Sequence, residues 1–223
     1  MIKFNTASVD SFVISFSNEI SLEVSQMIKF YFQEINKIEY IIDVIPSYTT
    51  ILITFDIFNI SLEKLQNQIL DINFTSNNQE NESTIIEIPS YYGEEVGLDL
   101  KRISEINNIS VKDIIEIHSS QIYTVFTIGF APGFAYLGQV DKKIATPRLD
   151  SPRRIVKKGS IAIADTQTAI YPQDSPGGWN IIGLTTFNMF NKELDNLCPL
   201  SMGDKIKFKP ISQAEFINLG GEI

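Results

Sequence analysis

The sequence has very little of the two residue types that most often bind transition metals. Its 223 residues include one cysteine, Cys198, and one histidine, His118. A single cysteine cannot form an intramolecular disulfide, and a single histidine cannot by itself make a histidine-based metal site. We therefore predict no metal site of these types and place the chain in a reducing compartment, the cytoplasm.

Positive charge and long apolar runs are also scarce. The chain has 18 Lys and Arg against 27 Asp and Glu, a net charge of −9, which argues against a broad surface for nucleic acid or anionic membrane. The N-terminus lacks the basic and apolar segments of a signal peptide. The most apolar long window, residues 122–137, is broken by Gly129, Pro132 and Gly133 and is too short to span a bilayer. We therefore expect no export, no membrane anchor and no nucleic-acid partner.

What the chain does have is the composition of a folded protein, with 43% hydrophobic and 11% aromatic residues. The first third alternates strand-like and helix-like patterns, and its two expected helices begin at Ser21 and Ser61, both good N-cap residues. We predict a small α/β sandwich domain over residues 1–72. The polar segment 73–84 has the composition of an exposed linker.

The remaining residues, 85–223, predict a second domain dominated by β-structure. A strand and two short helices, residues 99–107 and 110–119, come first. Short β-rich segments separated by Gly, Pro, Asp and Ser then follow as far as the C-terminal end. Many short strands with turn residues between them indicate a barrel or a sandwich. The overall fold class is therefore α+β.

The segment GFAPGFAYLG, residues 129–138, holds aromatic side chains on a stretch that we expect to be neither helix nor strand. Its glycines permit unusual backbone shapes and Pro132 fixes one φ, so the loop is rigid without being regular. Such a loop either plugs the mouth of a barrel or lines a pocket. The candidate ligand-binding residues here are Phe130, Pro132, Gly133, Phe134 and Tyr136.

A basic segment, TPRLDSPRR, contains two Pro-Arg pairs. A proline before each of Arg148 and Arg153 stiffens the chain, and a guanidinium on a stiff loop suits bidentate binding of carboxylate or phosphate. The alternative is a solvated basic loop paired with nearby acids.

A third segment, TQTAIYPQDSPGGWN, contains the only tryptophan of the chain. Adjacent glycines let the backbone approach a ligand, and their N–H groups can form an anion-binding nest. A wide turn whose tryptophan caps the barrel explains the same pattern. The candidate residues are Gln167, Tyr171, Pro176, Gly177, Gly178 and Trp179.

Taken together, these three segments and the late MGDKIKF resemble the family of the 5-oxoprolinase B subunit, also called the kinase A inhibitor or allophanate hydrolase subunit 1 family. The resemblance extends over nearly the whole chain. It implies an N-terminal α/β domain followed by a cyclophilin-like β-barrel. It also implies a second cyclophilin-like partner, the C subunit, acting with the A subunit to open 5-oxo-L-proline to L-glutamate with ATP and Mg²⁺. One departure is VKKGS, where Lys157 and Lys158 replace the family's Pro and Ala.

The resemblance also bears on three further candidates. It implies that Asp99, Glu94 or His118 shuttles protons, while Arg148 and Arg153 stabilise developing charge. From the residues alone, Glu94 and Asp99 are equally well explained as surface carboxylates. His118, at the end of an expected helix, is as well explained by a favourable contact with the helix dipole. Cys198 is expected to be a packed thiol.

The sequence thus predicts one component of an ATP-dependent 5-oxoprolinase that is nearly inactive without its partners. The alternative from another class is a regulatory protein that inhibits autophosphorylation of a sensor histidine kinase, which the same family name records. A prolyl isomerase follows from the barrel alone and is weakly supported, because a fold does not carry an activity.

Overall fold

The computed structural model describes residues 2–74, 85–193 and 197–223. The chain separates into two compact units, Met1–Glu82 and Ser83–Ile223. Most of the predicted linker, 73–84, lies outside the described residues, so its exact bounds stay a prediction.

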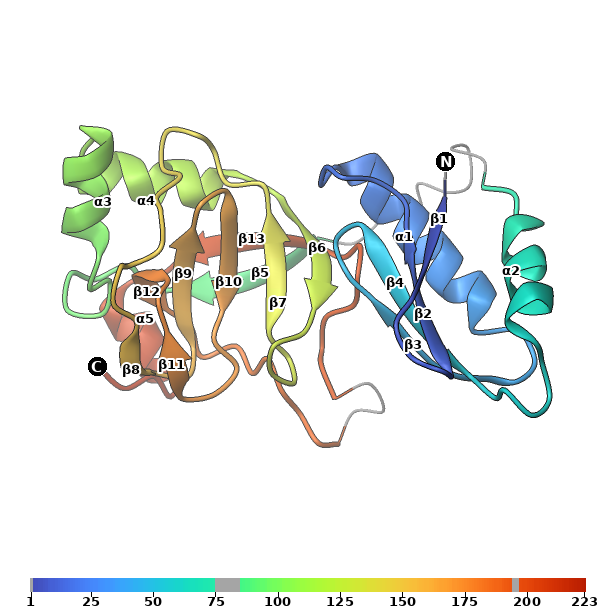
Figure 1. The fold of residues 1–223 in the computed structure, drawn as a ribbon. Helices are drawn as coiled ribbons and strands as arrows, with labels where there is room; N and C mark the ends of the chain where they lie inside the picture. Colours follow the sequence, from blue (N-terminus) through green and yellow to red (C-terminus); the bar gives the residue numbers. More distant parts are fainter. Residues whose placement is uncertain (1, 75–84, 194–196) are drawn as a thin grey trace. The chain divides into compact units, whose positions relative to one another are not determined.

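The first unit is a four-stranded antiparallel sheet with two helices, as the alternating patterns predict (Figure 1). Ser21 and Ser61 cap the helices by accepting hydrogen bonds from the N–H groups of Val24 and Lys64 at 3.2 and 3.3 Å. Alternate residues of the inner strands are buried, which is the period of a sheet with one covered face. The elements are β1 (Lys3–Thr6), β2 (Ser11–Ser15), α1 (Leu22–Ile35), β3 (Ile41–Pro46), β4 (Thr50–Phe55) and α2 (Leu62–Leu70), with strand order β1-β2-β4-β3.

The second unit is a nearly closed seven-stranded barrel, as predicted. Its strand order is β12-β9-β10-β7-β6-β13-β5, and Tyr91 at the end of β5 pairs with Leu184 at the end of β12, which joins the two edges. In Figure 1, β5 and β13 form the wall behind β9, β10 and β7. The elements are β5 (Ile85–Ser90), α3 (Leu100–Asn107), α4 (Val111–Ser120), β6 (Tyr123–Ile128), β7 (Ala135–Gly138), β8 (Arg153–Val156), β9 (Ser160–Ala164), β10 (Gln167–Ile170), β11 (Ser175–Gly177), β12 (Asn180–Leu184), β13 (Lys205–Pro210) and α5 (Gln213–Asn218).

One expectation about the segment 129–138 was wrong. Its second half, AYLG, is the regular strand β7, which lies between β6 and β10 in the barrel wall. Only residues 129–134 form the irregular loop. The error has a physical cause: the glycines and proline mark the turn, but pairing on both sides lets a glycine-ended strand persist because the sheet supplies its hydrogen bonds.

The barrel core is filled by aliphatic and aromatic side chains from all walls, closed at one side by α3 and α4. Among its largest fully buried members are Ile88, Tyr123 and Phe208. Within the described ranges, no helix combines the length and apolar character needed to cross a membrane. The barrel is a packed scaffold, and the predicted site residues lie mostly on its strand ends and loops.

Candidate functional site

Four aromatic side chains, two from the segment 129–138 and two from TQTAIYPQDSPGGWN, meet beside the barrel. The ring of Phe134 lies at their centre, with centroid distances of 4.8 Å to Tyr136, 5.3 Å to Tyr171 and 5.8 Å to Trp179. Phe134, Tyr171 and Trp179 are buried, whereas Tyr136 is partly exposed. We call Phe134, Tyr136, Tyr171 and Trp179 the aromatic site.

The irregular loop 129–134 both closes this site and extends beyond it. Hydrogen bonds from Gly129 N to Phe134 O and from Phe134 N to Ala131 O, both 3.0 Å, fold it into a tight turn. Gly133 has φ +81°, and a Cβ there would lie 2.1 Å from Met189 O, so glycine is required. The loop therefore buries Phe134 as a plug and presents Phe130, which is 70% exposed, to solvent.

Phe130 has an unusual backbone for an aromatic residue. Its φ is +73°, in the left-handed region that bulky side chains avoid. Its ring makes an edge contact with Phe134 at 5.4 Å. Pro132, two positions further along the same loop, is also exposed. Strained residues of this kind are concentrated at functional sites, which is consistent with the predicted role of Phe130.

The Pro-Gly-Gly-Trp turn contributes Trp179 to the aromatic site and packs against Tyr171. A Cβ at Gly177 would lie 2.2 Å from the hydroxyl oxygen of Tyr171, so this glycine makes room for the buried phenol. A Cβ at Gly178 would have its nearest neighbour at 3.6 Å, an ordinary contact. Pro176 is exposed in β11, and Gln167 lies at the start of β10, opposite Gly138 of β7. The two glycines thus have different roles.

Arg148 lies over the indole of Trp179. Its guanidinium carbon is 5.6 Å from the ring centroid, within the range of a cation–π contact. Burial raises the pKa of Tyr136, and the charge of Arg148 opposes that rise. Arg148 itself is exposed, so its charge lies at the boundary between the aromatic site and solvent.

Arg153 and Asp99, both predicted site residues, form an ion pair. Arg153 Nη2 donates to Asp99 Oδ1 at 2.7 Å, and the other carboxylate oxygen accepts from the N–H of Ile181 at 2.7 Å. Arg153 Nη1 is buried and has no hydrogen-bond partner among the residues that the structure describes. Burial raises the pKa of Tyr171, and Arg153 is one of the charges that oppose the rise. Arg153 pairs in register with Gly177, which packs against the Tyr171 hydroxyl, so Arg153 lies at the edge of the aromatic site.

His118 lies apart from this group, in the barrel core. Its ring is fully buried, with Nδ1 2.8 Å from the Tyr92 hydroxyl and Nε2 2.9 Å from the Thr168 hydroxyl. Thr168 donates its only proton to Ala162 O, so Nε2 carries the histidine proton and Tyr92 donates to Nδ1. Desolvation lowers the pKa of His118 to about 3. At neutral pH this histidine is an uncharged link between α4, β10 and the segment after β5.

Glu94 is a surface carboxylate in this structure. It pairs with Lys101 of α3 at 2.8 Å, and both side chains are mostly exposed. The ion pair raises the pKa of Lys101. Such a pair adds little to stability. Its contact with Lys101 therefore directs Glu94 toward α3 rather than toward the aromatic site.

Sequence reasoning missed two residues that hold the Arg148 loop: Asn180 and Arg102. Asn180 is fully buried, and its side-chain amide donates to Pro147 O at 2.9 Å. Arg102 donates to the other end of that amide, Asn180 Oδ1. The sequence carried no signal for them, because the burial of Asn180 and its need for hydrogen-bond partners are visible only in the structure.

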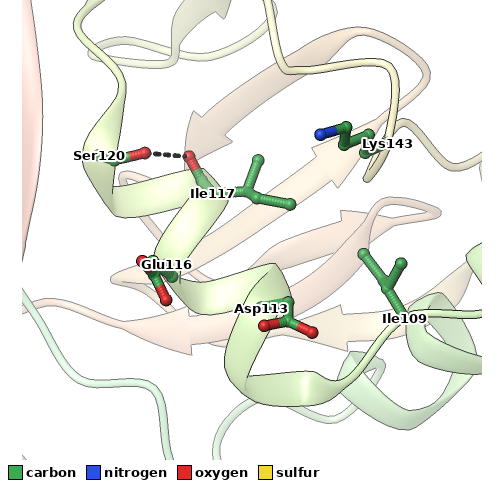
Figure 2. Close-up of a pocket in the computed structure, with 6 residues that line it drawn as sticks. All are labelled: Ile109, Asp113, Glu116, Ile117, Ser120 and Lys143. Carbon is green, nitrogen blue, oxygen red and sulfur yellow. Dashed lines mark hydrogen bonds between the residues drawn. The ribbon is translucent and has the colours of Figure 1, made fainter.

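A separate hollow of about 520 Å³ lies on the outer face of α4 (Figure 2). Lys143, from the segment after β7, faces Asp113 and Glu116 of the helix across it. None of the residues that line the hollow is a predicted site residue. They are Ile109, Asp113, Glu116, Ile117, Ser120 and Lys143. The hollow is therefore distinct from the aromatic site.

Comparisons with known proteins place the chain in a family. The model of the carboxyltransferase domain, subdomain C and D, matches residues 2–200. The 5-oxoprolinase B subunit of Bacillus subtilis is 34% identical over 186 residues, 78% of each chain. The 5-oxoprolinase B subunit of Haemophilus influenzae is 45% identical over 123 residues, 55% of this chain and 58% of that protein.

A solved structure supports the fold. The crystal structure of TTHA0988 superposes with a TM-score of 0.80 at 24% identity over 95% of this chain. This chain spans 40% of the length of TTHA0988. The family match over most of the sequence and the shared fold lead to one conclusion: the chain belongs to the family of carboxyltransferase domains, subdomain C and D, and is a homologue of the 5-oxoprolinase B subunit.

Proposed function

We propose that this chain acts as the B subunit of an ATP-dependent 5-oxoprolinase, and that the aromatic site with Arg148 and Arg153 is its share of the substrate site. The relatives that carry the name of this subunit support the activity. The observation that carries the location is the meeting of two arginines with the aromatic site. Arg148 lies over Trp179, and Arg153 borders Tyr171 with a buried nitrogen that has no partner among the described residues.

The chemistry of the substrate fits these groups. 5-Oxo-L-proline is a small ring that carries a carboxylate, so flat aromatic faces suit the ring and guanidinium groups suit the carboxylate. Its lactam carbonyl is unreactive because the nitrogen donates electron density into it. Phosphorylation by ATP makes the carbonyl oxygen a leaving group, and arginines stabilise the negative charge on a transferred phosphoryl group.

Within this proposal, Asp99 and His118 have supporting roles. Both oxygens of Asp99 already accept hydrogen bonds, so it holds Arg153 in place and anchors β12. His118 is buried and uncharged, and it fixes β10 behind the aromatic site through Thr168. Glu94 has an accessible carboxylate, but it pairs with Lys101 away from the aromatic site, so we assign it no proton transfer at this site.

Part of the active site lies on partners in this proposal. The sequence contains no Gly-x-x-x-x-Gly-Lys-Ser/Thr phosphate-binding loop. The described residues also contain no group of three or more His, Cys, Asp or Glu side chains placed to hold a metal ion. Because Mg²⁺ that accompanies a nucleotide needs only one or two protein carboxylates beside the phosphates, we propose that it arrives with the nucleotide or is held by a partner. We assign those parts to the C and A subunits.

The test is reconstitution from purified proteins. The chain alone should form almost no glutamate from 5-oxoproline and ATP, and the chain with its co-purified partner subunits should form it at a steady rate. Omitting ATP is the control. Robust turnover by the chain alone would contradict the shared site. Capture of a sensor histidine kinase by an assembly that forms no glutamate would favour the regulatory alternative instead.

A further inference from the structure

The backbone of Arg148 is fixed on both sides. In the peptide group before Arg148, the carbonyl oxygen of Pro147 accepts a hydrogen bond from Asn180 Nδ2 at 2.9 Å. In the peptide group after Arg148, the N–H of Leu149 donates a hydrogen bond to Gly178 O at 2.7 Å. When both flanking peptides are held, φ and ψ of the residue between them are set. The direction in which Arg148 leaves the loop therefore depends on residues 178 and 180, which flank the tryptophan that it covers.

The Asn180 side chain is itself held firmly. Its Nδ2 also donates to Ile163 O at 3.0 Å, and Arg102 donates to its Oδ1. Arg102 Nη1 also lies 3.4 Å from Pro147 O. An amide can turn over and exchange its oxygen and nitrogen. With Arg102 on the oxygen, the nitrogen must face Pro147, whereas the reversed amide would place oxygen against oxygen.

We propose that Asn180 and Arg102 are positioning residues that together hold Arg148 over Trp179. Asn180 fixes the peptide before Arg148, and Arg102 fixes the orientation of the Asn180 amide. The consequence for substrate binding rests on the proposed function, in which Arg148 binds the carboxylate or a phosphate. The positioning of Arg148 does not depend on the proposed function, because it concerns only contacts within the chain.

Trp179 provides a direct readout, because it is the only tryptophan in the sequence. Its fluorescence in the purified chain depends on the cation above its ring. Arg148→Met removes that cation and defines the emission of the uncovered indole. Arg102→Met should move the emission of Trp179 most of the way toward that of Arg148→Met, although the hydrogen bonds of Arg102 go to Asn180 and Pro147. Arg102→Lys, which keeps a donor, should restore much of the original emission.

The variants are chosen so that folding does not decide the result. Asn180→Ala removes a fully buried amide and leaves backbone oxygens unpaired, so it can fail to fold. Arg102 is only partly buried and tolerates replacement better. Lys112→Met, at an exposed position on α4, is the control for the loss of one positive charge. A cooperative thermal transition for each variant confirms that the spectra report folded protein.

Kinetics of the reconstituted enzyme supply a second arm. Arg102→Met should raise KM for the anionic substrate about two- to tenfold, the worth of one hydrogen bond, with a smaller change in kcat. Trp179 emission that is unchanged in folded Arg102→Met, or in Arg148→Met, would overturn the positioning proposal. If emission shifts as expected but Arg148→Met leaves KM unchanged, the positioning stands and the binding role of Arg148 in the proposed function fails.

Discussion

Arg153 and Asp99, 54 positions apart in the chain, are joined by a hydrogen bond of 2.7 Å between Nη2 and Oδ1. Asp99 is almost fully buried, while the side chain of Arg153 is about a quarter exposed. The pair uses one guanidinium nitrogen and leaves Nη1 buried without a partner in the described part of the chain. A guanidinium held by one nitrogen is oriented to bind an anion with the other.

The first prediction follows from this geometry. Arg153→Lys keeps the charge and one contact to Asp99 but cannot extend a second, planar donor. In the reconstituted enzyme we expect substrate or nucleotide binding to weaken by about 1.5–3 kcal/mol, roughly ten- to a hundredfold in KM. The melting temperature should change little. Lys157→Ala, at an exposed position in the following VKKGS segment, is the control. If Arg153→Lys leaves the kinetics unchanged and Lys157→Ala is inactive, the anion binds near Lys157 rather than at Arg153.

The second prediction distinguishes the two adjacent glycines. Gly177→Ala places a methyl group 2.2 Å from the Tyr171 hydroxyl, so the buried ring must shift. We expect a loss of about 1–3 kcal/mol in the free energy of unfolding, measured by urea denaturation. Gly178→Ala meets nothing closer than 3.6 Å and should leave stability nearly unchanged. Equal stability of the two variants would show that the Tyr171 ring moves freely, contrary to the packing described above.

The third prediction concerns the exposed ring of Phe130. Phe130→Gly removes a side chain that is 70% exposed and relieves the positive φ, worth about 1 kcal/mol. The isolated chain should therefore be as stable as the original or slightly more stable in thermal denaturation. Activity of the reconstituted enzyme should fall if Phe130 contacts substrate or partner. Phe134→Ala is the contrasting variant: its ring is buried, and we expect a loss of about 3–5 kcal/mol. A marked loss of stability in Phe130→Gly would mean that the ring serves the fold.

The fourth prediction is a pH dependence of stability that His118 controls. Its pKa is about 3 in the native protein and about 6.5 when unfolded, so between about pH 3 and 6.5 mainly the unfolded chain binds the proton. The stabilisation is fully present above pH 6.5 and is lost as the pH falls from 6.5 toward 3. The expected slope is about 1.4 kcal/mol per pH unit well below 6.5.

The measurement compares urea unfolding at pH 7 and pH 5, a window in which the chain's single histidine is the main titrating side chain. The free energy of unfolding should fall by about 2 kcal/mol. His118→Gln can still accept from Tyr92 and donate to Thr168, so it should fold and show a much smaller difference between the two pH values. The same difference in both proteins would rule out His118 as its source.

The sequence by itself determined the local elements and the identity of the site segments. Ser21 and Ser61 marked two helix starts because a hydroxyl at the N-cap satisfies an otherwise unpaired N–H. Glycine, proline and aromatic residues in two segments identified Phe134, Tyr171 and Trp179, which the structure brings together. The motifs also supported the correct family, because their residues need no knowledge of long-range packing.

Only the tertiary structure decided what each polar side chain does. Asp99 and Glu94 are both carboxylates near α3, yet one is buried against Arg153 and the other pairs with Lys101 at the surface. Burial of His118 in the barrel core, rather than its place at a helix end, sets its low pKa. Asn180 and Arg102 hold the Arg148 loop across contacts that span 33 to 78 positions. Because partners, burial and charge state depend on segments far apart in the chain, no local pattern could have assigned them.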